Sequence, residues 1–159
     1  MADVNGRLLN PALAGGALYD IGVYPIELMS YLGGEPITDA VGVYRPHPET
    51  GVDVTSSVIL RFRTFDAVFQ CTVSSPAEEY ICVYGTKGKV ILPHASTGNT
   101  AELMADGGRE TFTCSYENGF TFEVKEFASL IRAGKTESER VPACVTAETA
   151  GVYEKVLGK

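Results

Sequence analysis

The chain has 159 residues, 45% of them hydrophobic and 21% charged, which is the size and composition of one soluble globular domain. Its formal charge is −7, from 13 basic and 20 acidic side chains. A surface this acidic repels phosphate backbones, so we expect no nucleic-acid partner. The sequence contains no apolar run approaching about 20 residues, so we expect no membrane-spanning helix.

The four cysteines, Cys71, Cys82, Cys114 and Cys144, form no Cys-x-x-Cys pair, and a chain of this size needs no disulfide to fold. Free cysteine behaves as a small hydrophobic residue, so we expect reduced, buried thiols. A disulfide between Cys71 and Cys82 across a hairpin remains an alternative. Reduced thiols, with an N-terminus that lacks the pattern of a secretion signal, favour the cytoplasm.

A first helix is predicted from about Gly16 to Leu32, ended by Gly33-Gly34. Pro25 lies inside this span and cannot donate to the carbonyl of Ile21, so we expect a kink or a broken turn there. Alternatively, the helix begins at Asp20, which would then be its cap. The apolar positions that carry the helical spacing are Leu18, Ile21, Leu28, Met29 and Leu32.

The middle of the chain is dominated by strand signals separated by glycine-rich turns, among them Gly85-Thr86-Lys87-Gly88 and Asp106-Gly107-Gly108. Sequential hairpins of this kind form an antiparallel meander. The predicted strands are Ile37–Arg45, Thr55–Phe65, Ala67–Ser74, Glu79–Tyr84, Lys89–Leu92, Ala101–Met104 and Glu110–Ser115.

Two helices are predicted to close the chain, at about Thr121–Ala133 and at about Thr146–Leu157, the second with Thr146 as its cap. A helix, then many strands, then two helices predict an α+β fold: a mostly antiparallel open sheet with helices packed on one face. We expect residues 1–14 to be irregular and residues 15–159 to form this single domain. The expected helix faces are Val124, Phe127, Ala128 and Ile131, and Ala150, Tyr153, Val156 and Leu157.

Asp20 and Tyr24 are the candidate catalytic residues. On a helix, residues four apart lie on one face with one turn between them. A carboxylate beside a phenol is able to orient a substrate hydroxyl and handle its proton. A nearby cation would improve the phenol as an acid–base group, but this segment contains no Lys or Arg. The structural alternative is that Asp20 caps the helix and that the Tyr24 hydroxyl bonds to backbone.

Other motifs in the sequence are weak. Gly85-Thr86-Lys87-Gly88 lacks the spacing of a phosphate-binding loop, so we interpret it as a plain turn. His47 and His94 have no Cys or carboxylate at metal-ligand spacing, so we expect them in surface loops and predict no metal site.

The segment Gly15-Gly16-Ala17-Leu18-Tyr19-Asp20-Ile21-Gly22-Val23-Tyr24-Pro25 resembles the helix that opens the second domain of the Gfo/Idh/MocA oxidoreductases, in their dihydrodiol dehydrogenase branch. Other stretches are similar to that family in the same order, from Leu32-Gly33-Gly34-Glu35-Pro36 through Tyr84–Val90 to Phe122–Phe127. The resemblance implies a C-terminal domain of the glyceraldehyde-3-phosphate-dehydrogenase-like kind. It also implies that Asp20 and Tyr24 belong to the site of an NAD(P)-dependent enzyme of sugars, polyols or dihydrodiols.

The family places its nucleotide on a Rossmann domain with Gly-x-Gly-x-x-Gly after a strand, and on a Glu-Lys-Pro motif whose lysine assists proton transfer. This sequence contains neither pattern, so we expect the Rossmann domain to be absent, in an excised piece or a naturally lone domain. We therefore expect no cofactor-binding residues, no NAD or NADP bound to this chain and no dehydrogenase activity from it alone.

The resemblance also implies assembly through an open sheet face. Alternating apolar strands such as Val58-Leu60-Phe62 and Val68-Cys71-Val73 suit such a face, which its own helices or a partner must cover. We expect a homo-oligomer, most simply a dimer, which also works with the missing Rossmann domain and a small-molecule substrate. The rival hypothesis is a stand-alone scaffold or ligand-binding domain that lost its nucleotide-binding half.

Overall fold

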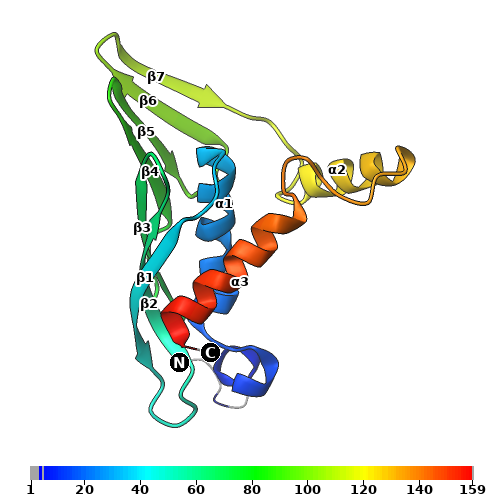
Figure 1. Cartoon of the computed structure of the whole chain (residues 1–159). Helices are drawn as coiled ribbons and strands as arrows, with labels where there is room; N and C mark the ends of the chain where they lie inside the picture. Colours follow the sequence, from blue (N-terminus) through cyan, green and yellow to red (C-terminus); the bar gives the residue numbers. More distant parts are fainter. Residues whose placement is uncertain (1–3, 5, 159) are drawn as a thin grey trace. The chain divides into compact units, whose positions relative to one another are not determined.

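The computed structural model of the chain describes residue 4 and residues 6–158. The chain divides into two compact units, one made of Met1–Pro76 with Glu137–Lys159 and the other of Ala77–Thr136. Each unit contains one antiparallel sheet whose strands follow one another in chain order (Figure 1). The predicted α+β class and the predicted meander are therefore confirmed. In the described part of the chain, no helix is long and apolar enough to cross a membrane.

The sheet of the first unit has the order β1 (Asp39–Pro46), β2 (Asp53–Arg61) and β3 (Asp66–Thr72). Because side chains alternate along a strand, the register separates two faces. One face is buried and contributes Ala40, Ser56, Val58, Leu60 and Cys71 to the core. The other face is exposed and carries Val41, Val43, Ile59 and Val68.

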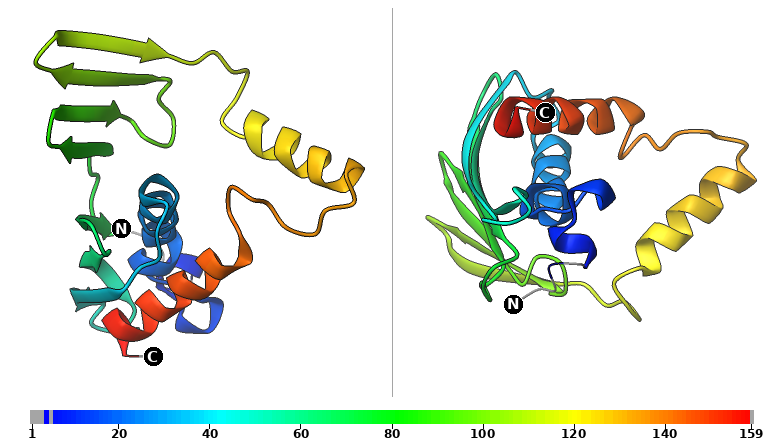
Figure 2. Two further views of the ribbon diagram at one scale, coloured as in Figure 1. Left: turned by 45° about the horizontal axis from the view of Figure 1, so that its top comes forward. Right: turned by 90° about the horizontal axis from the view of Figure 1, so that it is seen from below.

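Two helices cover the buried face: α1 (Val23–Gly33), which continues from the π-helical turn η3 (Leu18–Gly22), and α3 (Ala143–Leu157) (Figures 1 and 2). The contact of α3 with β1 is close, because a Cβ on Gly42 would lie 3.0 Å from Val156 Cγ1. The helices and the sheet together bury Leu18, Ile26, Val58, Leu60, Phe62, Val152 and Val156.

The first helix differs in detail from its prediction. It starts and ends close to the predicted residues, with Gly34 at its end in the left-handed conformation (φ 62°). Asp20 is not its cap, since it lies inside the helical span. The buried positions are Leu18, Gly22, Ile26 and Ser30, four residues apart, whereas Leu32 is exposed. The π-turn shifts the helical phase, which explains why the sequence pattern missed Ile26.

The segment predicted to be irregular contains two short 3-10 turns, η1 (Arg7–Leu9) and η2 (Pro11–Leu13). Leu9 is buried against Val52 and Val54 in a small second core cluster. The backbone N–H of Gly16 donates to the carbonyl of Leu8 (2.9 Å), which ties this segment to the start of the helix.

The last helix begins about one turn earlier than predicted. Its first residue is Ala143 and Pro142 precedes it in an extended conformation, so Thr146 lies inside the helix and is not its cap. The carboxylate of Glu137 instead accepts the N–H of Ala143. The buried stripe is correspondingly rotated: Ala150 is exposed, and Thr149 and Val152 are buried with the predicted Val156 and Leu157.

The second unit contains β4 (Tyr80–Gly85), β5 (Gly88–Pro93), β6 (Thr100–Ala105), β7 (Gly108–Thr113) and α2 (Thr121–Arg132). Thr86-Lys87 forms the turn between β4 and β5, as predicted. The rings of Tyr116 and Phe122 meet edge to face at 5.9 Å, and the Tyr116 hydroxyl donates to the carbonyl of Gly98 (2.8 Å). The contact joins the start of α2 to the segment after β7, and Phe122 itself is exposed, as are Val124, Phe127 and Ile131.

The sheet face of Val58, Leu60 and Phe62 was expected to be covered by the chain's own helices or by a partner, and it lies under α1 and α3. The predicted burial of the cysteines needs correction. Of the four cysteines only Cys71 is buried, while Cys114 and Cys144 are exposed, and all four are free thiols. Cys114 follows the end of β7 and Cys144 lies in α3, so the apolar surroundings in the sequence did not predict which cysteines are buried.

Replacing Gly16 should destabilise the fold strongly. Gly16 has a φ of 127°, and a Cβ there would overlap Asp53 Oδ1, so Gly16→Ala combines backbone strain with a clash against a buried carboxylate. We expect a loss of roughly 3 kcal/mol or more in the free energy of unfolding. Gly34→Ala is the matched control: its φ is 62° but nothing lies within 4 Å of the added Cβ, so a loss of about 1 kcal/mol is expected. Urea unfolding of both variants measures the difference, and equal losses would contradict the proposed clash.

Candidate functional site

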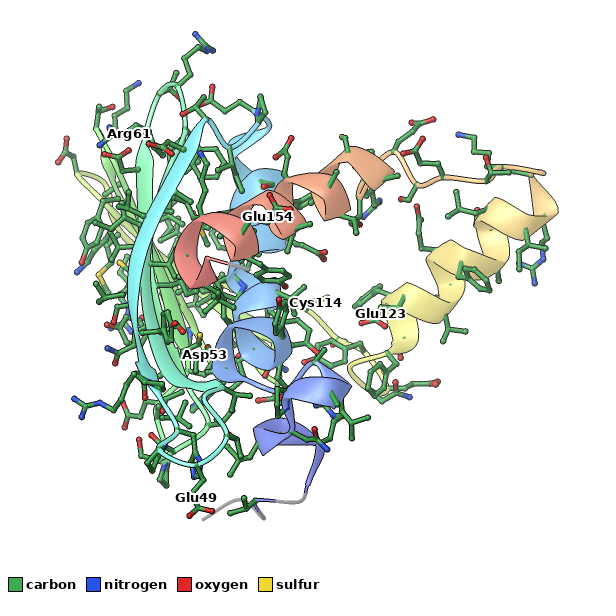
Figure 3. All side chains as sticks on the ribbon, turned by 60° about the horizontal axis from the view of Figure 1, so that its bottom comes forward. Glu49, Asp53, Arg61, Cys114, Glu123 and Glu154 are labelled. Atoms are coloured by element: carbon green, nitrogen blue, oxygen red, sulfur yellow. The ribbon has the colours of Figure 1, made fainter. Side chains whose placement is uncertain are left out.

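A buried carboxylate, that of Asp53, supports the helix on which the candidate site residues lie. Asp53, at the start of β2, is only 3% exposed and lies beside the turns that lead into the first helix (Figure 3). Its Oδ2 accepts hydrogen bonds from the backbone N–H of Leu18 (2.7 Å) and from the hydroxyl of Ser56 (2.7 Å). A carboxylate at a helix N-terminus is favoured by the helix dipole and satisfies a backbone donor that would otherwise be unpaired. Asp53 therefore fixes the start of the helix that carries Asp20 and Tyr24.

The π-helical turn Leu18–Gly22 lies directly before Pro25. Proline has no N–H to donate and its ring crowds the carbonyl four residues earlier, which here belongs to Ile21. A wider turn accommodates both effects without ending the helix. The predicted irregularity at Pro25 is thus confirmed as a π-turn, and Asp20 lies within it.

Asp20 and Tyr24 point away from the core. The buried positions Leu18, Gly22 and Ile26 define a line along the helix, and residues four apart stay on such a line. Asp20 and Tyr24 follow a parallel line displaced by two residues, which is roughly the opposite side of the helix. The Tyr24 side chain is accordingly 71% exposed, and its hydroxyl makes no hydrogen bond to any described residue. Among the described residues, the structure therefore does not support the alternative in which this hydroxyl bonds to backbone.

The structure adds a cation that the sequence did not predict. Arg7, from η1, forms an ion pair in which Nη2 donates to Asp20 Oδ1. The Arg7 side chain is 56% exposed and that of Asp20 27%. Because the two residues lie 13 positions apart and Arg7 belongs to a segment without periodic pattern, no local signal indicated the contact. The site therefore consists of a carboxylate, a guanidinium and a phenol.

The thiol of Cys71, which is close to the π-turn, has a shifted pKa. Burial, and secondarily the negative charge of Asp53, raise the pKa of Cys71 to about 12. A Cβ on Gly22 would lie 3.5 Å from Cys71 Sγ, which places the thiol under the π-turn. Cys71 is thus a neutral, inert packing residue.

The described residues do not fit a dinucleotide. Such a cofactor lies at the carboxyl edge of a parallel sheet with its pyrophosphate at a helix N-terminus, but both described sheets are antiparallel. The helix that follows Gly15-Gly16 has its N-terminus occupied by the Asp53 carboxylate, which would repel a phosphate. No cluster of His, Cys, Asp and Glu in the described part of the chain is able to hold a metal ion. His47 and His94 lie in strand-connecting loops, as predicted.

Comparisons with known proteins point to one family. The family model for the GFO/IDH/MocA C-terminal domain matches residues 2–91. The chain is 31% identical over 160 residues to the trans-1,2-dihydrobenzene-1,2-diol dehydrogenase of Homo sapiens and 31% identical over 162 residues to that of Bos taurus, covering 94% of this chain in both cases and 48% of each relative. The chain thus spans about half the length of these curated relatives.

Solved structures share the fold. The aldose-aldose oxidoreductase from Caulobacter crescentus complexed with glycerol matches with a TM-score of 0.82 at 22% identity, over 98% of this chain and 50% of that one. KijD10, a 3-ketoreductase from Actinomadura kijaniata in complex with NADP and TDP-benzene, matches with a TM-score of 0.81 at 18% identity, over 96% of this chain and 49% of that one. The chain therefore has the fold of about half of each of these two longer chains.

Thiol labelling should separate the four cysteines. At pH 8 we expect Cys114 and Cys144 to react rapidly with iodoacetamide, Cys82 more slowly and Cys71 only after unfolding, because burial keeps Cys71 protonated. Since the folded state raises this pKa above its usual 9.0, Cys71 stabilises the fold below about pH 9 and loses that contribution as the pH rises toward 12. Mass spectrometry of labelled peptides measures the rates. Native-state labelling of Cys71 as fast as that of Cys114 would contradict its burial, and Cys71→Ala should remove only the thiol that appears on unfolding.

Proposed function

This chain belongs to the GFO/IDH/MocA family as a C-terminal domain, and we propose that it supplies substrate-site residues and the oligomer interface of an NAD(P)-dependent oxidoreductase that acts on a sugar, polyol or dihydrodiol. The observation that carries the proposal is the outward-facing pair Asp20 and Tyr24 on the helix after Gly15-Gly16. The Tyr24 side chain is exposed and its hydroxyl bonds to no described residue, so this hydroxyl is available to a substrate.

Asp20 and Tyr24 divide the handling of a substrate hydroxyl. The Asp20 carboxylate accepts a hydrogen bond from the hydroxyl and thereby orients it. The Tyr24 hydroxyl, which both donates and accepts, lies within one helical turn and moves the proton. The redox chemistry belongs to the dinucleotide, for which the described residues offer no site.

We further propose that a separate nucleotide-binding domain works together with this chain. A dinucleotide-binding Rossmann domain, joined in cis or supplied in trans, would complete the site and carry NAD or NADP. The relatives are about twice as long as the region they share with this chain, which leaves room for such a domain. The chain alone would then bind no nucleotide and catalyse no oxidation.

The proposed oligomer interface is the exposed face of β1–β3, formed by Val41, Val43, Ile59 and Val68. These residues adjoin one another in the strand register, with Val41 opposite Ile59 and Ile59 opposite Val68. The ion pair Arg61–Asp66 (3.4 Å) borders the patch at one end. An apolar centre with a charged rim is the usual composition of an association surface. A lone scaffold domain, the rival function, would keep this face but would not need Asp20 and Tyr24.

Fusion to a nucleotide-binding half tests the catalytic part. We expect the chain, joined behind the portion of the human relative that it does not match, to reduce NADP when given dihydrodiols, and the chain alone to reduce nothing. Asp20→Asn and Tyr24→Phe should fold normally and lower kcat/KM by about 100-fold, since each removes a group that handles the proton. Tyr31→Phe, at another exposed tyrosine of α1, is the control. A fusion that binds NADP but shows equal activity with and without Asp20 and Tyr24 would refute the assignment.

Introducing negative charges on the exposed face of β1–β3 tests whether this face is the oligomer interface. We expect Val43→Glu combined with Val68→Glu to convert a dimer into a monomer in light scattering at tens of micromolar, because like charges would then meet across the two copies. Val124→Glu, at an equally exposed valine of α2, should leave the dimer intact. A wild-type chain that is monomeric at this concentration, or a dimer broken only by Val124→Glu, would contradict the proposed face.

A further inference from the structure

We propose that Arg7 is a further substrate-contacting residue, whose guanidinium binds the hydroxyl next to the reacting one, so that the site selects vicinal diols. The inference rests on the proposed function, since it assigns Asp20 and Tyr24 to the reacting hydroxyl. It goes beyond it by adding a residue from the N-terminal segment and by naming the substrate feature that this residue recognises.

Arg7 is held in place by the same scaffold that holds Asp20. Its carbonyl accepts the N–H of Asn10 (3.2 Å), and the carbonyl of the next residue, Leu8, accepts the N–H of Gly16 (2.9 Å). Leu9 is buried against Val52 and Val54, which flank Asp53. Both Arg7 and the helix start are therefore tied to the beginning of β2, so the ion pair forms between two backbone segments that are held in place.

The ion pair leaves hydrogen-bonding capacity on both partners. A guanidinium has five N–H donors, and only Nη2 donates to a described residue, Asp20 Oδ1. The second carboxylate oxygen of Asp20 accepts from no described residue. Since the Arg7 side chain is 56% exposed, the donors that bind no described residue are accessible beside a carboxylate oxygen that also binds none. The pair thus presents an acceptor and several donors side by side.

A vicinal diol is complementary to this arrangement. One of its hydroxyls donates to the Asp20 carboxylate, and the oxygen of the neighbouring hydroxyl accepts from the Arg7 guanidinium. A diol whose hydroxyls are on carbons across the ring from each other, as in a 1,4-diol, can make only one of these bonds at a time. Losing one hydrogen bond to a charged group lowers affinity by about tenfold.

Charge favours an uncharged ligand. Arg7 and Asp20 neutralise each other, so the local formal charge of the pair is zero although the chain carries −7. A neutral polyol exchanges water for hydrogen bonds without separating the ion pair. A phosphorylated or carboxylated sugar would have to compete with Asp20 for Arg7 and would meet the negative surface of the chain. We therefore assign neutral vicinal diols as the preferred class.

The test measures binding to the chain itself. The ¹⁵N-labelled chain is titrated with trans-1,2-cyclohexanediol and with trans-1,4-cyclohexanediol, and the backbone amide shifts of residues 19–24 give both dissociation constants. We expect the 1,2-isomer to bind about tenfold more tightly to the wild type. Arg7→Gln should abolish this preference and leave the weaker binding of the 1,4-isomer unchanged. Arg7→Lys, which keeps the charge but loses the planar fork, should show an intermediate preference.

Arg63→Gln is the matched control, because Arg63 is also an exposed arginine paired with a carboxylate, Glu35 (3.3 Å). We expect the wild-type preference in this variant. Wild-type chain that binds both isomers equally at residues 19–24, or Arg7→Gln that keeps the preference, would overturn the role of Arg7 and leave the proposed function standing. Absence of shifts at residues 19–24 with either diol would also overturn the role of Arg7, since the chain would then bind no diol there. The proposed function itself is overturned only if the fusion that binds NADP shows no dependence on Asp20 and Tyr24.

Discussion

One buried carboxylate joins the sheet to the helix that carries the candidate site. Asp53 accepts the Leu18 N–H and the Ser56 hydroxyl with a single oxygen while its side chain is almost wholly removed from water. Burying an unpaired charge is costly, and each hydrogen bond that compensates it contributes about 1.5–3 kcal/mol. The charge is therefore tolerated only where the helix start meets β2. This requirement also explains Gly16, since any Cβ at that position would occupy the space of the carboxylate.

The same helix is fixed at its other end. The Glu35 carboxylate accepts the backbone N–H and the hydroxyl of Thr64 (both 2.8 Å), and these hydrogen bonds hold the pKa of Glu35 below its usual value. A Cβ on Gly33 would meet the ring of Phe65, which stacks on Phe62 at 4.2 Å. The helix is thus attached to the strand β2 and its following loop at both ends. A helix attached at both ends is able to contain a π-turn and still pack on the sheet. Such π-turns are frequent at functional sites.

The fold class and the order of elements could be predicted from the sequence, because they depend on local patterns. A short motif was enough to select Asp20 and Tyr24 as candidate site residues, and that assignment stays a prediction. The strand pattern and the glycine-rich turns specify a meander without reference to distant residues. Arg7 and Asp53 could not be predicted, since each acts through a contact 13 or 35 positions away. Asp53 is a polar residue at the start of a strand and Arg7 is an arginine in an irregular segment. Both are common in such places, so neither indicated a special role. The error at Thr146 has the same origin: the carboxylate of Glu137 provides the cap from outside the helix.

The proposed activities use opposite sides of the same elements. Along the helix, Leu18, Gly22 and Ile26 face the sheet, and Asp20 and Tyr24 face away from it. Across the sheet, Val58 and Leu60 face the helices, and Val43, Ile59 and Val68 face away from them. The covered core lies between the candidate site and the candidate interface, and no described side chain belongs to both. Charges placed on the interface residues therefore do not touch the hydrogen bonds that hold Asp20. The proposed assembly and the proposed substrate handling should consequently be separable by mutation, because alternation within each element places the two sets of candidate residues on different sides.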